Sequence, residues 1–170
     1  MKKQTKEKFL KIIDEQKKLY GSLKELIGTE SKALTDKDIK KIDGIIKQQD
    51  VIVLSIKKLE DEKNTIFNLM IEETGLPQSP LIKLKDVLER IDKNDAIEIE
   101  KAVVELISIV KEIASINAQN TNLIKNYVNY VDFVMKMKEK IEQPQTAIYT
   151  QNGNKKEIKA NKDSKIDKTI

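Results

Sequence analysis

The 170-residue sequence contains no cysteine and no histidine. Disulfide bonds and thiolate metal sites are therefore excluded, as is imidazole, the side chain that most often transfers protons near neutral pH. The five glycines are isolated and form no phosphate-binding loop, and no serine lies in a nucleophile motif. We therefore expect no cofactor, no metal ion and no enzymatic activity.

Long apolar runs are missing as well. The longest contain four residues, such as 51–54, which is far too short to cross a membrane. The first ten residues, Met-Lys-Lys-Gln-Thr-Lys-Glu-Lys-Phe-Leu, lack the apolar centre of a signal peptide. We expect a soluble, cytoplasmic protein that does not insert into membranes.

Arginine is almost absent although the net charge is +4, since Arg90 is the only one. Arginine is the usual side chain for contacts with base edges and for bidentate contacts with phosphate. Lysines are interspersed with acidic residues, as in residues 57–63, which is typical of solvent-exposed helix faces with ion pairs. The sequence therefore predicts no nucleic-acid partner.

The composition that remains is typical of long helices. Aromatic residues make up 4% of the chain and charged residues 35%, and there are only three prolines. With so few large aromatic side chains, the core must be an extended aliphatic seam. We predict an all-α fold.

Apolar spacing predicts two long helices in the first half of the chain. The first covers about residues 5–33. Thr35 is the expected N-cap of the second helix, which ends near Thr74 because Gly75 supplies a C-terminal cap. The short turn between the two helices makes them antiparallel neighbours.

Two further helices follow. Ser79 and Pro80 are expected to open a short helix over residues 80–91, and Asn94 or Asp95 is expected to cap a long last helix that ends before Pro144. We predict an up-and-down bundle of three long antiparallel helices plus one short helix in residues 1–143, as a monomer or homodimer. The polar residues 144–170 form a flexible tail.

The long last helix, residues 96–143, carries an apolar seam with alternating spacings of four and three, which keeps one face toward a partner helix. Asn117 and Asn120 interrupt this seam, and five asparagines lie between residues 117 and 129. They form either a polar layer that fixes helix register at some cost in stability or a polar face that hydrogen-bonds a partner. The two interpretations are compatible.

Two segments resemble those of the FlgN-type flagellar export chaperones. Residues 116–124, Ile-Asn-Ala-Gln-Asn-Thr-Asn-Leu-Ile, resemble a segment with two spaced asparagines followed by an aliphatic pair. Residues 147–153, Ala-Ile-Tyr-Thr-Gln-Asn-Gly, resemble the segment of tyrosine, three residues and glycine that follows the last helix of that family. Residues 34–39, 48–49 and 59–60 agree in order and spacing, so the resemblance covers residues 5–155.

The resemblance implies a cytoplasmic chaperone that binds the C-terminal segments of the hook-associated proteins FlgK and FlgL and delivers them to the flagellar type III export gate. It also implies that a tail tyrosine contacts the gate protein FlhA, which matches Tyr149 and, with it, Gly153. The expected client-binding residues lie on the last helix: Asn117, Asn120, Leu123, Ile124, Tyr127, Val131 and Val134.

A structural coiled-coil or adaptor protein without a flagellar client is the alternative. Such a protein would share every helical feature described above. It would be distinguished by a tight homodimer whose apolar seam is satisfied without a client.

Overall fold

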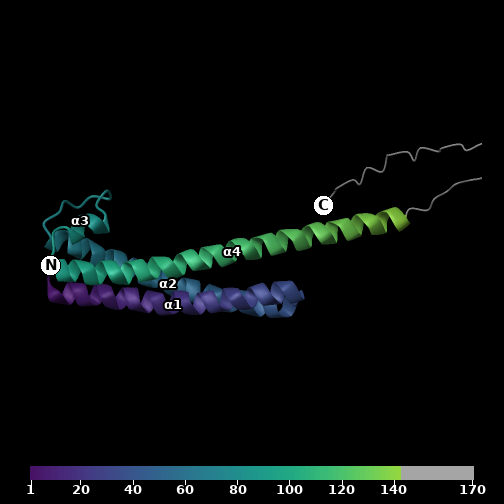
Figure 1. Cartoon of the computed structure of the whole chain (residues 1–170), viewed down its shortest axis with the longest axis horizontal. Helices are drawn as coiled ribbons and strands as arrows, with labels where there is room; N and C mark the ends of the chain where they lie inside the picture. The colour runs from purple at the N-terminus through teal and green to yellow at the C-terminus, as the bar shows by residue number, and fades with distance from the viewer. Residues whose placement is uncertain (143–170) are drawn as a thin grey trace, which may run out of the picture. The chain divides into compact units, whose positions relative to one another are not determined.

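The computed structural model describes residues 1–142 of the chain, with the side chains of residues 1–138. This range holds four helices and no strand: α1 (Lys3–Asp36), α2 (Ile39–Glu73), α3 (Leu84–Leu88) and α4 (Lys93–Glu142) (Figure 1). The predicted all-α class is confirmed for the described residues.

The contacts divide the chain into two units, Met1–Val128 and a part that begins at Asn129. The division lies within α4. The predicted tail, residues 144–170, lies outside the described residues.

The turn between α1 and α2 is built by two backbone features. Lys37 adopts a left-handed conformation with φ 58°, and the N–H of Asp38 donates to the carbonyl of Ala33 at 3.0 Å, which closes the end of α1. The Asp38 carboxylate then accepts the N–H of Lys41 at 3.1 Å and caps α2.

The predicted N-cap of α2, Thr35, was therefore wrong. Thr35 belongs to the last turn of α1, where its hydroxyl donates to the Ser31 carbonyl at 2.9 Å. A threonine hydroxyl satisfied by the carbonyl four residues earlier fits inside a helix, so α1 continues to Asp36.

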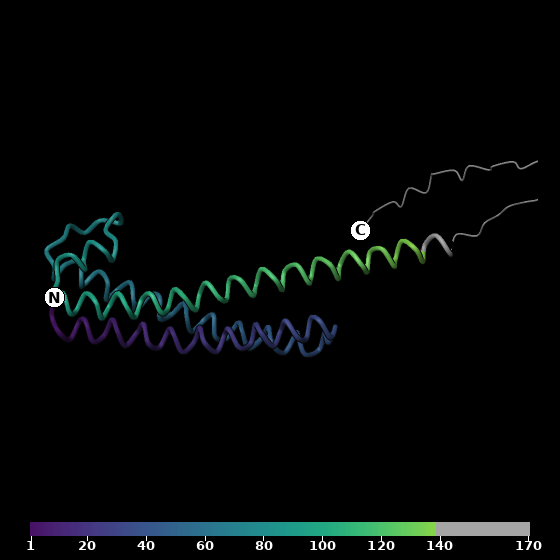
Figure 2. The backbone as a smooth tube through the Cα atoms, viewed as in Figure 1, coloured from purple at the N-terminus to yellow at the C-terminus, as the bar shows by residue number. Residues whose placement is uncertain are grey.

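α1 and α2 lie side by side and run in opposite directions (Figure 2). The hydrogen-bonded pairs between them show this direction, because the residue number of the partner in α2 falls as the residue number in α1 rises. In order along α1 these pairs are Lys2–Glu73, Gln16–Glu60 and Glu30–Gln49.

α4 also contacts α1, but it runs parallel to it within the unit that ends at Val128. The residue numbers of both partners rise together along this contact. In order along α1 the pairs are Lys6–Asp95, Lys17–Glu105, Lys24–Glu112 and Ser31–Asn120.

The end of α2 agrees with the prediction. Gly75 has φ +70°, its N–H donates to the Glu72 carbonyl at 3.0 Å, and the N–H of Leu76 donates to the Ile71 carbonyl at 3.2 Å. These are the two bonds of a Schellman turn.

The short helix is smaller than predicted, because α3 spans only Leu84–Leu88. Ser79 accepts the N–H of Leu81 at 3.3 Å but starts no helix. The Asp86 carboxylate instead accepts the N–H of Lys83 at 2.7 Å, which places the helix start four residues after Pro80.

The cap of α4 also differs from the prediction. The Asp92 carboxylate accepts the N–H of Asn94 at 2.8 Å and that of Asp95 at 3.4 Å. Asp92 therefore caps α4 instead of Asn94 or Asp95, because its side chain lies within reach of two unpaired N–H groups.

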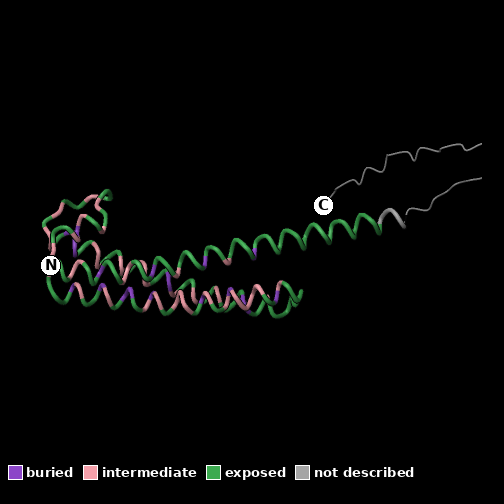
Figure 3. The backbone as a smooth tube through the Cα atoms, in the orientation of Figure 1, coloured by how far each residue is buried: buried purple, intermediate pink, exposed green. Residues whose placement is uncertain are grey.

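Two apolar clusters form the core of the unit that ends at Val128, and Figure 3 colours the buried positions of the backbone purple. The first joins all four helices through Phe9, Ile13, Met70, Ile71, Val87, Ile99 and Leu106. The second joins α1, α2 and α4 through Leu23, Ile27, Ile56 and Ile113.

Along α4 the buried residues recur every seventh position, and they end in a polar one. They are Ile99, Leu106, Ile113 and Asn120. Every described α4 side chain after Asn120 is exposed. Among the helices of the described range, none combines the length and the apolar character needed to cross a membrane.

Candidate functional site

Asn120 is the last buried residue among the described side chains of α4, with 3% of its surface exposed. Its Oδ1 accepts the Ser31 hydroxyl at 2.5 Å, and its Nδ2 donates to the Ile27 carbonyl at 3.3 Å. Both ends of the amide therefore contact α1. This is the geometry of a polar layer, and it places the Asn120 side chain inside the unit and not on its surface.

Asn117 lies one turn earlier and has the opposite environment. Its side chain is exposed, and its backbone carbonyl accepts the Thr121 hydroxyl at 2.9 Å. The two asparagines that interrupt the predicted seam are therefore not equivalent, because only Asn117 faces solvent.

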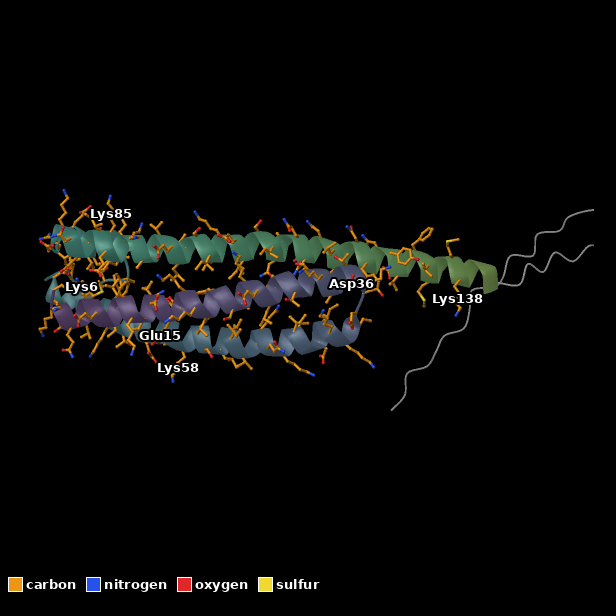
Figure 4. All side chains as sticks on the ribbon, turned by 60° about the horizontal axis from the view of Figure 1, so that its bottom comes forward. Lys6, Glu15, Asp36, Lys58, Lys85 and Lys138 are labelled. Atoms are coloured by element: carbon orange, nitrogen blue, oxygen red, sulfur yellow. The ribbon has the colours of Figure 1, made fainter. Side chains whose placement is uncertain are left out.

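Leu123, Ile124 and Tyr127 follow on α4 and are 39%, 44% and 39% exposed. They are brought together with residues of the α1–α2 turn around a small apolar hollow of about 110 Å³. Figure 4 labels Asp36, which marks this end of α1. The residues that the turn adds to the hollow are Leu34, Lys37, Ile39 and Ile42.

Lys37 contacts the aromatic ring of Tyr127. Its ammonium nitrogen lies 5.7 Å from the ring centroid, within the range of a cation–π interaction. The left-handed conformation of Lys37, which ends α1, thus also directs a positive charge to the edge of the hollow. Lys37 is the only charged residue among those that line it.

Two of the predicted client-binding residues belong to the part of α4 that begins at Asn129. Val131 is 38% exposed and Val134 is 42% exposed. The predicted gate-docking residues, Tyr149 and Gly153, lie outside the described residues.

Electrostatic contacts set the register of α4 on α1. Lys6 Nζ lies 2.6 Å from Asp95 and 2.9 Å from Glu98, and only 16% of its side chain is exposed. The hydrogen bond to Asp95, followed by that to Glu98, raises the pKa of Lys6. Further along, two more α1 lysines meet α4 carboxylates, in the pairs Lys17–Glu105 and Lys24–Glu112.

These ion pairs favour one register of α4 on α1, and this register determines which residues meet at the hollow. The basic partners all lie on α1 and the acidic partners all lie on α4. A shift of one helical turn would place the lysines beside the wrong residues and would break the bonds of Asn120. The register that satisfies them places Tyr127 beside Lys37.

The N-terminal end of α1 is held by α2. The Glu73 carboxylate accepts the N–H of Lys2 at 2.7 Å and the hydroxyl of Thr5 at 2.8 Å. The bond from the Lys2 N–H is the main cause of a lowered pKa of Glu73. Lys2 offers no capping side chain of its own, so α2 supplies the cap of α1.

Gln16 is a fully buried polar residue between α1 and α2. Its Nε2 donates to Glu60 at 3.0 Å, while its Oε1 has no hydrogen-bond partner. Burial raises the pKa of Glu60, but the hydrogen bonds from Lys63 and Gln16 outweigh it, so the pKa lies below its usual value. Glu60 therefore stays charged between the helices at neutral pH.

Sequence reasoning placed the client-binding residues on the last helix alone and did not predict that the α1–α2 turn lies beside three of them. The signal was the position of Ile39 directly after a helix cap, with Ile42 three residues later. Within residues 1–142, no acidic cluster is arranged to hold a metal ion.

The fold and this surface define a class, an all-helical protein with an exposed apolar face of the kind that binds other proteins. The chain belongs to the FlgN protein family, whose sequence model matches residues 1–157. The resemblance found in the sequence is thereby confirmed. Membership implies a general role as a flagellar export chaperone that binds flagellar hook-associated proteins. No curated protein and no solved structure matches the chain.

Proposed function

We propose that this protein is a cytoplasmic, non-enzymatic chaperone that binds the C-terminal segments of the hook-associated proteins FlgK and FlgL and delivers them to the export-gate protein FlhA. Family membership supports the general role. The observation that carries the specific proposal is the series of large apolar side chains on α4 that remain 38–60% exposed from Leu123 to Val134.

The proposed scaffold is an up-and-down bundle of α1, α2 and the part of α4 that ends at Val128. It is supported by the antiparallel contacts of α1 with α2, by the parallel contacts of α1 with α4, and by the two shared apolar clusters. A bundle of three helices leaves apolar side chains uncovered because each helix has fewer neighbours than in a closed four-helix bundle.

The proposed client site consists of exposed residues at spacings of three, four and seven, which suit the apolar face of a client helix laid along α4. Asn117 supplies an exposed amide at its start, while Asn120 supports it through α1. The exposed members are Asn117, Leu123, Ile124, Tyr127, Val131 and Val134.

The site is tested by light scattering coupled to size-exclusion chromatography, with the protein and a hook-associated protein from the same genome. We expect a 1:1 complex with wild type, and its loss with Ile124→Asp, because a carboxylate in the contact would be desolvated without a partner. Val53→Asp is the matched control, since Val53 is 50% exposed on α2. A wild-type protein that forms no complex at micromolar concentration would contradict the proposed function.

The gate contact is proposed for Tyr149 and Gly153 in the segment after α4. We expect Tyr149→Ala to keep client affinity and to lose FlhA binding in a pull-down with both partners. Unchanged FlhA binding would refute this assignment and leave the client site untouched.

The alternative, a structural coiled-coil or adaptor protein, predicts a different outcome of the same light-scattering experiment. A tight homodimer that does not change when a hook-associated protein is added would favour it.

A further inference from the structure

Methionine carries the only sulfur atoms of this chain, because the sequence contains no cysteine. The four methionines are Met1, Met70, Met135 and Met137. Oxidants convert a methionine thioether to a sulfoxide, which is polar where the thioether was apolar. The places of these four side chains in the fold therefore decide which surface an oxidant would change.

The four methionines differ in their exposure. Met70 is 0% exposed in the apolar cluster that joins all four helices, and Met1 packs against the same cluster. Met135 and Met137 are 55% and 48% exposed and lie two residues apart on α4. An oxidant dissolved in water reaches these two sulfur atoms first, because close packing shields a buried thioether from it.

The two exposed methionines adjoin the valines of the proposed client site. Met135 follows Val131 by four residues, and these spacings make two residues neighbours on a helix surface. Met137 follows Val134 by three residues, and Val134 follows Val131 by three. The four side chains therefore form one continuous surface, the methionine patch (Val131, Val134, Met135 and Met137), whose members are 38–55% exposed. A client helix that covers the two valines also lies over the thioethers.

Reduced methionine suits such a surface. Its unbranched side chain is flexible and apolar, so it adapts to partners of different shape. A sulfoxide oxygen instead accepts hydrogen bonds from water, and burying it against the apolar face of a client helix without a donor costs free energy. The same two positions thus favour binding when they are reduced and oppose it when they are oxidised.

We propose that Met135 and Met137 form an oxidation site through which hydrogen peroxide lowers the affinity of this protein for its client. The thioether sulfur attacks one peroxide oxygen, the O–O bond breaks, and the proton of the transferred oxygen moves to the departing hydroxide. The products are one sulfoxide and one water molecule, and the two electrons that the sulfur loses reduce the peroxide. Methionine sulfoxide reductases reverse the change. The proposal rests on the proposed function, because the affected affinity is that for the hook-associated protein.

Peptide mapping by mass spectrometry tests the site without any client. The full chain is treated with hydrogen peroxide, the peroxide is removed, and the mass of each methionine-containing peptide is measured. We expect Met135 and Met137 each to gain one oxygen atom while Met70 gains none, because Met70 is fully buried. Oxidation of Met70 as fast as that of Met135 and Met137 would overturn the proposal.

Isothermal titration with the C-terminal segment of an untreated hook-associated protein tests the consequence. The proteins are wild type and the double variant Met135→Leu/Met137→Leu, which keeps the apolar character and nearly the volume of both side chains but has no sulfur there. For each protein, the readout is the ratio of Kd after peroxide to Kd before it. We expect a ratio of at least about ten for wild type, reversed by methionine sulfoxide reductases, and below about two for the double variant.

The outcomes separate the proposal from the proposed function. A wild type whose two methionines are oxidised and whose Kd is unchanged would overturn the proposal and leave the proposed function standing. An equal loss of affinity in the double variant, or a loss of circular dichroism at 222 nm on oxidation, would also overturn it, since the cause would then lie elsewhere or in unfolding. An untreated wild type that binds no hook-associated protein would refute the proposed function, and the proposal with it.

Discussion

Replacement of Asn120 by alanine is the sharpest test of how α4 is attached to α1. Asn120 is buried and makes two hydrogen bonds to α1, to the Ser31 hydroxyl and to the Ile27 carbonyl. A hydrogen bond of this kind contributes about 1 kcal/mol net. In the variant the Ser31 hydroxyl can donate its proton to the Ile27 carbonyl, which lies 3.0 Å away, so no donor is left unpaired. We expect Asn120→Ala to reduce the free energy of unfolding by about 2 kcal/mol.

Asn117→Ala is the matched control. It makes the same chemical change three residues earlier on α4, at an exposed side chain, so the gain in helix propensity from asparagine to alanine cancels in the comparison. Urea unfolding followed by circular dichroism at 222 nm measures both. With a slope of about 2 kcal/mol per molar urea, the midpoint of Asn120→Ala should lie about 1 M below that of Asn117→Ala.

A double-mutant cycle identifies the partner. Ser31→Ala leaves the buried Oδ1 of Asn120 without the Ser31 donor, which costs about 1–3 kcal/mol. In the double variant that penalty disappears, so the combined loss should fall short of the sum by about 1 kcal/mol. Equal urea midpoints for Asn120→Ala and Asn117→Ala, or full additivity with Ser31→Ala, would refute the inference that this residue attaches α4 to α1.

Three further changes test other parts of the scaffold. Gly75→Ala should destabilise the fold by about 1 kcal/mol because φ is +70° at this residue. Gly44→Ala lies inside α2 with no atom near the added methyl group, so it should stabilise the fold by about 0.5–1 kcal/mol. The two variants should therefore shift the thermal midpoint in opposite directions. Glu73→Gln should lower the stability near neutral pH, because the hydrogen-bonded carboxylate stabilises the fold only while it is ionised. The difference in stability from wild type should therefore shrink as the pH falls through the lowered pKa of Glu73. A constant difference over an acid titration would argue against the capping role. Lys6→Met should lose the ion pairs with Asp95 and Glu98, and the loss should diminish in high salt if attraction between charges is its cause.

The sequence was sufficient to predict the helices but not the residues that cap them. The 3.6-residue periodicity and Gly75 predicted α1, α2 and α4 to within a few residues, because both depend on local chemistry. Thr35 and Asp38 are both good capping residues, and the sequence alone does not decide between them. The choice depended on where α1 ended, which a left-handed Lys37 determines.

From the sequence, residues of the candidate site were predicted only on α4. The α4 residues from Leu123 to Val134 follow from the seam pattern, and their exposure agrees with a surface role. The opposite behaviour of Asn117 and Asn120 depends on the register of α4 against Ser31, and the contribution of Ile39 and Ile42 depends on the turn folding back to α4. Both are tertiary facts that periodicity does not contain.

The parallel contact of α1 and α4 has a consequence for the order in which the protein folds. The bonds that join these helices connect residues 88 to 93 positions apart in the chain, whereas the α1–α2 contact begins with a pair only 19 positions apart. Contacts distant in sequence close large loops and form late. The first two helices can therefore already fold into a hairpin once they have left the ribosome. The packing of α4, which carries most of the proposed client surface, is then the step that completes the fold.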